Sequence, residues 1–395
     1  MRTLKIISII FLFLLSSNLF ANSSTNTNNF EQYKQKQNKK FETYKKNINN
    51  DFVKYKKAYA LAFKVYKKSI LTKWNKAEFS TASKWVSYGK SYNTKQVVDF
   101  KNKKISFEVF AKNKKQAIKR FQAMQKELLK ANIKNSFRND HFEQNLIKIT
   151  KNKNTPNSKM KIIADILPNN YLENALKSLN KKDKNSEIQV FKRDKQKGKN
   201  TYRIVLQFPT NSLLKSARIY KKLVLKNSNK NSIPPALSYA IIECESYFNP
   251  LARSNIPAFG LMQIVPQSAG LDTYRFFFGK ARILSPAYLY EPKNNIFIGV
   301  GYLHIIYFKY MKYIKNPLSR IYCTIAAYNT GAGNVARAFE GDTNIYKASF
   351  MINTMSPEEV YFYLLRHLKY QETRNYLKKV KKRMAFYQSI LGNSL

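Results

Sequence analysis

Apolar and polar residues follow two different patterns along this chain, and the pattern changes near Pro209. Before it, helix-like spacings are mixed with short stretches in which apolar and polar positions alternate. After it, apolar residues recur at helical spacing as far as the C-terminus. Alternation favours strands and a 3.6-residue spacing favours helices. The pattern therefore predicts an α+β accessory domain over 31–210, followed by an all-α domain over 211–395.

The expected elements of the first domain come from this spacing. Aromatic residues spaced by three, four and eight between Phe30 and Trp74 predict an amphipathic helix pair. Polar segments separate the alternating stretches, as in hairpins. The expected strands are Val97–Phe100, Ile105–Val109, Ile188–Phe191 and Tyr202–Phe208, and the expected helices are Gln116–Ala131 and Tyr171–Leu179. This domain carries no chemical motif of its own.

The first residues have the order of a secretory signal peptide. Arg2 and Lys5 precede an apolar run from Ile6, and a small residue, Ala21, precedes a polar stretch. The run is shorter than the ~20 residues that a membrane span needs. We expect a signal peptide at 1–21, a disordered linker at 22–30 and export to the periplasm. An uncleaved membrane anchor is the alternative.

One carboxylate stands out in the second domain. Ser232 and Pro235 predict the start of a helix, and Pro250 predicts its end, so Glu245 falls in the last turn. The helix C-terminus and the apolar neighbours both disfavour a charged carboxylate. A glutamic acid that stays neutral near physiological pH suits general acid catalysis. We expect Glu243 to point elsewhere and to be solvated.

Four short motifs follow one another in a fixed order. They are ESYFNP at 245–250, GLMQ at 260–263, AYNTGAG at 327–333 and ETRNYL at 372–377. In order, spacing and chemistry they resemble the soluble-lytic-transglycosylase type of lysozyme-like domain. Further stretches after residue 270 are similar to the membrane-bound lytic murein transglycosylase C family, and the stretch 84–107 is loosely similar to that family's accessory domain.

The resemblance implies a fold, an activity and a site. The fold is a helical lysozyme-like domain, and the activity is cleavage of the MurNAc–GlcNAc β-1,4 bond of peptidoglycan with formation of 1,6-anhydro-MurNAc ends. Glu245 would be the catalytic acid and then base, with no metal or cofactor. The implied substrate-binding residues are Ser246 beside Glu245, Gln263 near the scissile bond, Tyr328 and Asn329 along the cleft, and Tyr376, which orients the carboxylate. A hydrolytic muramidase on the same fold and a non-catalytic wall-binding scaffold are the alternatives.

The cysteines and histidines limit what else the chain can be. The family is tethered by a lipid on a cysteine just after its signal sequence, but no cysteine precedes Cys244. We therefore expect no lipid anchor. Cys244 and Cys323 are either small core residues or one disulfide. The three histidines, His141, His304 and His367, form no metal-binding motif.

The charge of the chain points to an anionic partner. With 71 Lys and Arg against 23 Asp and Glu, the formal net charge is +48. Nucleic acid, a lipid surface and a carboxylate-bearing wall polymer would all attract such a protein. Export argues against nucleic acid and favours peptidoglycan. Peripheral membrane association, and recruitment by wall-synthesis or secretion machinery, are compatible with this interpretation.

Overall fold

The computed structural model describes residues 24–177, 188–191, 200–254 and 257–391. The chain divides into two compact units, Met1–Asp51 and Phe52–Leu395. The predicted signal peptide lies outside the described residues. Because the second unit contains both the sheet and the helical part, these two parts pack together. The domain boundary at 210/211 stays a prediction.

The first described element is one long helix, α1 (Ser24–Leu71), and not the expected helix pair. No glycine or proline occurs between these two residues, so nothing in the sequence breaks the helix. The helix begins inside the stretch 22–30, where we had expected a disordered linker. Within the second unit its buried side chains include Tyr59, Tyr66 and Ile70. Their spacing of seven and four gives the amphipathic face that the sequence predicts.

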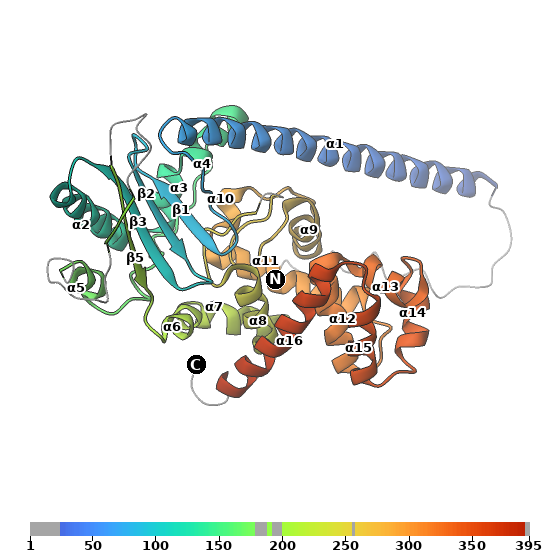
Figure 1. Ribbon diagram of the computed structural model, residues 1–395. Helices are drawn as coiled ribbons and strands as arrows, with labels where there is room; N and C mark the ends of the chain where they lie inside the picture. The colour runs from blue at the N-terminus through green and yellow to red at the C-terminus, as the bar shows by residue number, and fades with distance from the viewer. Residues whose placement is uncertain (1–23, 178–187, 192–199, 255–256, 392–395) are drawn as a thin grey trace, which may run out of the picture. The chain divides into compact units, whose positions relative to one another are not determined.

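An antiparallel five-stranded sheet forms the α+β part, in the order β1-β2-β3-β5-β4 (Figure 1). Both predicted hairpins are confirmed. The first strand was not predicted, although Trp85, Val86 and Tyr88 are buried in it. The strands are β1 (Lys84–Tyr88), β2 (Thr94–Asp99), β3 (Lys104–Ala111), β4 (Ile188–Phe191) and β5 (Asn200–Gln207).

Four helices accompany this sheet. They are α2 (Lys114–Lys130), α3 (Ile133–Asn139), α4 (His141–Thr150) and α5 (Tyr171–Lys177). Phe121 and Leu128 are buried on α2, which packs against β3. Helices α3 and α4 were not predicted. Each begins at a side-chain cap, since Asn132 and Asp140 accept hydrogen bonds from backbone N–H groups of the first turn.

All regular elements described between 211 and 391 are helical. They are α6 (Ser212–Ile219), α7 (Lys221–Lys230), α8 (Pro235–Ser246), the π-helical turn η4 (Pro266–Gly270), α9 (Leu271–Phe278), α10 (Pro286–Leu289), α11 (Pro292–Ile305), the π-helical turn η5 (Ile306–Tyr310), α12 (Pro317–Thr330), α13 (Ala332–Glu340), α14 (Ile345–Ile352), α15 (Pro357–His367) and α16 (Gln371–Leu391). An α+β part followed by an all-α part confirms the predicted fold class.

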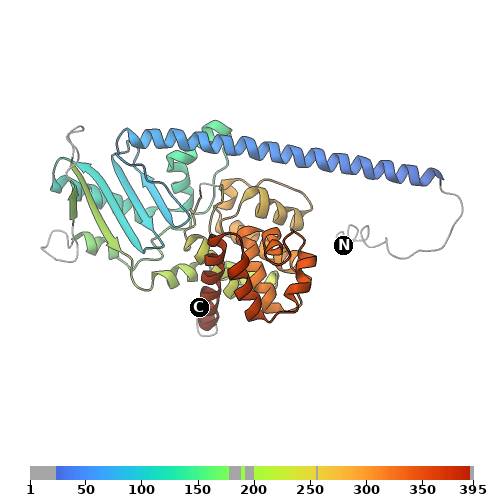
Figure 2. The same ribbon diagram turned by 45° about the vertical axis from the view of Figure 1, so that its right-hand side comes forward.

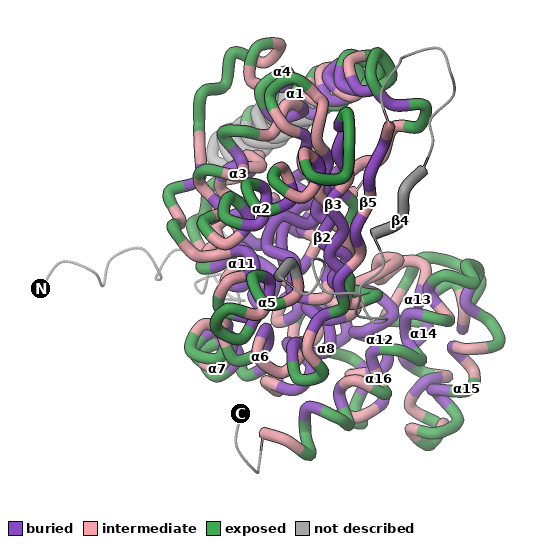
Figure 3. The backbone as a smooth tube through the Cα atoms, turned by 60° about the vertical axis from the view of Figure 1, so that its left-hand side comes forward, coloured by how far each residue is buried: buried purple, intermediate pink, exposed green. Residues whose placement is uncertain are grey.

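Helix α8 packs against α7 and α16. Figure 2 shows the red C-terminal helix α16 along one side of the helical part. Every side chain from Ala236 to Glu243 is buried, whereas α15 and α16 alternate between buried and exposed positions (Figure 3). Burial on all sides marks α8 as a central helix. Within the part of the chain that the structure describes, no helix is both long enough and apolar enough to cross a membrane.

Candidate active site

Glu245 occupies the last turn of α8, as the sequence predicts. The helix starts with Pro235 at its first position and ends at Ser246, and the capping residue Tyr247 has a left-handed φ of 52°. Phe248 follows with φ 63°. Two successive non-glycine residues in this region are unusual, and such conformations gather at functional sites. The turn is held by burial, since Phe248 is only 1% exposed and stacks on Tyr220.

The carboxyl group of Glu245 is partly buried and has one protein hydrogen-bond donor close by. The hydroxyl of Tyr376, on α16, donates to Glu245 Oε1 over 2.6 Å. The pKa of Glu245 is raised to about 7, chiefly by burial. The Tyr376 hydrogen bond works against this rise, and the charge of Glu372 adds to it. A carboxyl with this pKa is half protonated at neutral pH, so it can both donate and accept a proton.

Tyr328, on α12, lies near the same carboxylate. Its hydroxyl donates to the carbonyl of Met262 over 2.8 Å. Burial raises the pKa of Tyr328, and the charge of Glu245 adds to this shift. Burial and Glu245 act on Tyr376 in the same way. Both hydroxyls therefore remain protonated and act as hydrogen-bond donors.

The GLMQ loop brings Gln263 to the site in a constrained conformation. Gln263 has φ 46°, and its Nε2 donates to the carbonyl of Gly260 over 3.0 Å. Gly260 has φ 74°, and an added Cβ would lie 2.3 Å from Asn295 Nδ2 and 2.4 Å from the carbonyl of Leu289. Only glycine fits there.

The sequence analysis gave no role to Asn295, on α11, yet this side chain organises the loop. Its Nδ2 lies 2.8 Å from the carbonyl of Phe259 and 2.7 Å from that of Leu289. Its Oδ1 accepts a hydrogen bond from the Met262 N–H over 2.8 Å. A single amide thus satisfies several buried backbone groups, but nothing in the local pattern around Asn295 indicates it.

Ser246 is fully buried, at 0% exposure. Its Oγ lies 3.0 Å from the carbonyl of Ile242 and 2.7 Å from that of Leu261, and its single proton can go to either. The side chain therefore ties the GLMQ loop to α8. This geometry supports a structural role in the site and not the substrate contact that the family resemblance implies.

Asn329, next to Tyr328, connects two helices of the site. Its Oδ1 accepts a hydrogen bond of 2.7 Å from the hydroxyl of Thr373, on α16. Residues 328–334 are all partly exposed, and Gly331 has φ 88°. The AYNTGAG run thus presents backbone and side chains to solvent beside Tyr328. The structure brings Glu245, Gln263, Tyr328, Asn329 and Tyr376 into one region through their shared contacts.

The expectation that Glu243 is solvated is wrong. This carboxylate is 1% exposed. The hydroxyl of Tyr387 donates to Oε2 over 2.8 Å, and Arg383 Nε lies 2.8 Å from Oε1. Both partners belong to α16, which covers this side of α8. They lie about 140 residues away along the chain, so local periodicity could not reveal them.

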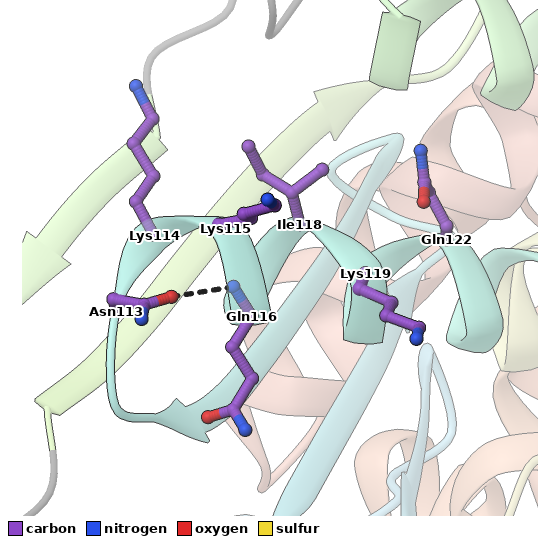
Figure 4. A pocket seen from close by; sticks show the side chains of 7 residues that line it. All are labelled: Asn113, Lys114, Lys115, Gln116, Ile118, Lys119 and Gln122. Atoms are coloured by element: carbon purple, nitrogen blue, oxygen red, sulfur yellow. Dashed lines mark hydrogen bonds between the residues drawn. The ribbon is translucent and has the colours of Figure 1, made fainter.

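A pocket on the α+β part is unsuited to the same chemistry. Figure 4 shows lysine and amide side chains around the start of α2, where Asn113 Oδ1 accepts from the Gln116 N–H over 2.9 Å. The residues that line it are Asn113, Lys114, Lys115, Gln116, Ile118, Lys119 and Gln122. With no carboxyl among these residues, the pocket offers no general acid.

Both cysteines are free thiols, Cys323 buried and Cys244 partly buried. This excludes the disulfide that the sequence left open. Among the described residues, no three His, Cys, Asp or Glu side chains gather as a metal site would require.

Comparisons with known proteins show a similarity over the part of the chain that contains Glu245, Gln263, Tyr328 and Asn329. The model of the transglycosylase SLT domain matches residues 222–350. Membrane-bound lytic murein transglycosylase C of Klebsiella pneumoniae is 42% identical over 179 residues, which cover 45% of this chain and 49% of that protein. The Serratia proteamaculans protein of the same name is 41% identical over 47% of this chain and 51% of its own length. The chain thus spans about half the length of these relatives.

The 70-kDa soluble lytic transglycosylase of Escherichia coli is a solved structure with some similarity. It is 27% identical, with a TM-score of 0.34, and the match covers 44% of this chain and 24% of that chain. Residues 222–350 are thus similar to the transglycosylase SLT domain, and just under half of the chain is similar to proteins named membrane-bound lytic murein transglycosylase C.

Proposed function

We propose that this protein is a peptidoglycan lytic transglycosylase that acts in the cell envelope, with Glu245 as its general acid and then its general base. The observation that carries the proposal is the environment of Glu245. A partly buried carboxyl with a pKa of about 7 ends a core helix of an SLT domain and accepts the Tyr376 hydroxyl.

In the first step the protonated Glu245 donates to the glycosidic oxygen between MurNAc and GlcNAc. Because the Tyr376 hydroxyl donates to Oε1, Oε2 is the oxygen that carries the proton. As the C1–O bond breaks, Glu245 becomes a carboxylate. The Tyr376 hydrogen bond favours this charged form, so it stabilises the product of the proton transfer.

In the second step the substrate supplies its own nucleophile. The C6 hydroxyl of MurNAc attacks C1, and the Glu245 carboxylate takes the hydroxyl proton. The C6–O–C1 bond closes the 1,6-anhydro ring, and Glu245 is protonated again for the next cycle. An intramolecular hydroxyl has a large advantage over water in effective concentration, so a second carboxylate is not needed.

The other site residues would hold the glycan. Gln263 and Asn329 are partly exposed amides that can bind sugar hydroxyl and acetamido groups. Tyr328 fixes the backbone at Met262, directly before Gln263. Ser246 is buried and supports the site indirectly, because its hydroxyl bonds to the carbonyl of Leu261 in the loop that carries Gln263.

One observation favours a second candidate, a hydrolytic muramidase. Glu372 is exposed and close enough to Glu245 for its charge to raise the pKa of that group. A hydrolase uses two carboxylates, one as acid and one as base or nucleophile. Glu372 is the residue that could fill the second role.

Product masses separate the two candidates. Purified sacculi are digested with the wild-type protein, and the muropeptides are analysed by mass spectrometry. The proposal expects 1,6-anhydro-MurNAc ends, which are lighter by one water than reducing ends. Reducing MurNAc ends as the main product would instead establish the hydrolase. Intact sacculi would contradict both and leave the wall-binding scaffold.

A further inference from the structure

The chain segment Asn249–Ser254 directly follows the catalytic turn, and the α+β part holds it in place. The Arg253 N–H donates to the carbonyl of Thr81 over 3.4 Å. The Asn249 side-chain amide donates to the carbonyl of Ala82 over 3.2 Å. From α1, the Tyr59 hydroxyl donates to the carbonyl of Ser254 over 3.0 Å. Backbone and side-chain groups of a loop next to Glu245 thus find their partners well over 150 residues earlier in the chain.

A buried ion network strengthens this junction. Arg253 is 5% exposed, and its Nη1 lies 3.0 Å from Asp140 Oδ2 and 3.4 Å from Glu143 Oε1. Its guanidinium stacks over the Phe142 ring at 4.5 Å, and the Tyr290 hydroxyl donates to Glu143 Oε1. Taking these charges out of water costs several kcal/mol each unless they are paired, so the network favours one arrangement of Arg253.

Hydrogen bonds continue from this segment to the active site. The Gly260 N–H donates to the carbonyl of Ala252 over 2.8 Å, next to Arg253 in the chain. The carbonyl of Gly260 in turn accepts from Gln263 Nε2 over 3.0 Å. An unbroken route therefore runs from the Arg253 network to the side chain that we place at the scissile bond.

We propose that Arg253, held by Asp140 and Glu143 of the α+β part, is a positioning residue for the Gly260–Gln263 loop of the transglycosylase site. The proposal rests on the function proposed above and gives the accessory part a second task besides any contact with the wall. A loop that carries a catalytic contact must be fixed to within a fraction of an ångström, and a rigid support outside the loop provides this. The α+β part is then a component of the active site.

The test compares Arg253→Met with Lys95→Met in the full-length protein. Lys95 is a matched control, since it is 7% exposed and its Nζ lies 2.9 Å from both Glu78 and Glu108. Each variant loses a buried cation that is paired with two carboxylates, but Lys95 belongs to β2 and its partners stay within the sheet region. Two quantities are measured below the unfolding temperature: hydrogen exchange of the Gly260 and Ile264 amides, and turnover on sacculi.

The proposal expects Arg253→Met to speed exchange of these amides at least about tenfold and to lower kcat by a similar factor, because small displacements of catalytic groups are costly. Lys95→Met should leave both near wild type. If Arg253→Met does not fold, the same two measurements are made on Tyr59→Phe. This variant removes only the hydroxyl that donates to the carbonyl of Ser254. It should speed exchange at Gly260 several-fold.

Wild-type exchange and kcat in the folded Arg253 and Tyr59 variants would overturn the proposal and leave the accessory part as a wall-binding module. Equal effects in Lys95→Met would also overturn it, because the loop would then respond to any loss of stability. If the wild type does not degrade sacculi, the proposed function fails, whereas the exchange comparison still decides whether Arg253 holds the loop.

Discussion

Glu245 is subject to two opposing effects on its proton. Burial favours the neutral acid, and the Tyr376 hydrogen bond favours the carboxylate, so the pKa settles at about 7. The first effect could be predicted from the sequence, because Glu245 ends an apolar helix. The second could not be derived from the local pattern, since Tyr376 is 131 residues away. Only the resemblance of the ETRNYL motif to a known family pointed to it.

Removal of the Tyr376 hydroxyl should shift the pH profile in a defined direction. Tyr376→Phe deletes the interaction that lowers the pKa of Glu245, so the pKa should rise and the acid form should persist to higher pH. The alkaline limb of the pH profile of kcat/KM should therefore move to higher pH. At the pH optimum, kcat should fall about tenfold or more, because the carboxyl loses its orientation. Tyr322→Phe, at a buried tyrosine outside the site, is the control. A limb that moves to lower pH would contradict the account.

A second residue-scale prediction concerns Glu372. If the substrate hydroxyl is the nucleophile, Glu372→Gln should keep turnover within about threefold of wild type, since a general base or nucleophile is worth far more. The loss of a negative charge near Glu245 should also lower the pKa of Glu245 slightly. Rates and product masses on sacculi check this. A loss of a thousandfold would assign Glu372 a catalytic role and favour the hydrolase.

At the scale of elements, α8 and α16 together build the site. The prolines at 235 and 250 predicted where α8 starts and stops, because proline signals are local. Ser232 does not cap the helix, since its N-cap is Pro234 and no side chain bonds there.

The family resemblance implied the contact of Tyr376 with Glu245, but nothing in the sequence predicted that Tyr387 of the same helix would cover Glu243. Residues that pair across such long separations leave no periodic signal. β1, α3 and α4 were missed for a different reason, since each has ten residues or fewer and so carries little periodic pattern.

Tyr387 and Tyr239 stack on each other, but removal of the hydroxyl should affect the free energy of unfolding differently at the two positions. Tyr387→Phe leaves a buried acceptor on Glu243 unpaired and should lower the free energy of unfolding by about 1–3 kcal/mol. Tyr239, 5.1 Å away by ring centroids, buries a hydroxyl with no hydrogen-bond partner among the described residues. Tyr239→Phe should be neutral or stabilising. Denaturant titration of both variants checks the pair, and equal losses would show that the hydroxyl–Glu243 bond contributes nothing.

At the scale of the whole molecule, composition predicted the kind of partner and the order of the two parts, but not how they join. The α+β part and the helical part meet through Arg253, which lies over 100 residues along the chain from its partners Asp140 and Glu143. No pattern within either part indicates this junction. The net charge, in contrast, can be predicted from the sequence, because it is a sum over all residues and does not depend on which residues are in contact.

The net charge of +48 predicts a salt effect that depends on the substrate. Sacculi carry stem-peptide carboxylates, so raising salt from about 0.05 M to about 0.5 M should screen the attraction and slow their digestion several-fold. Soluble glycan fragments without stem peptides should be cleaved at rates that change less than about twofold under the same conditions. Equal slowing on both substrates would show that salt acts on the site itself and not on attraction to the wall.

The central claim is that the Glu245 carboxyl moves the proton in glycan cleavage, and Glu245→Gln tests it most directly. The variant keeps the shape and an acceptor for Tyr376 but cannot donate a proton as an acid. With the exposed Glu340→Gln as control, release of fragments from sacculi is measured for variants whose melting temperatures match wild type. The account predicts a loss of at least about a thousandfold for Glu245→Gln with wall binding retained, and wild-type rates for Glu340→Gln. Undiminished release by a folded Glu245→Gln protein would contradict it.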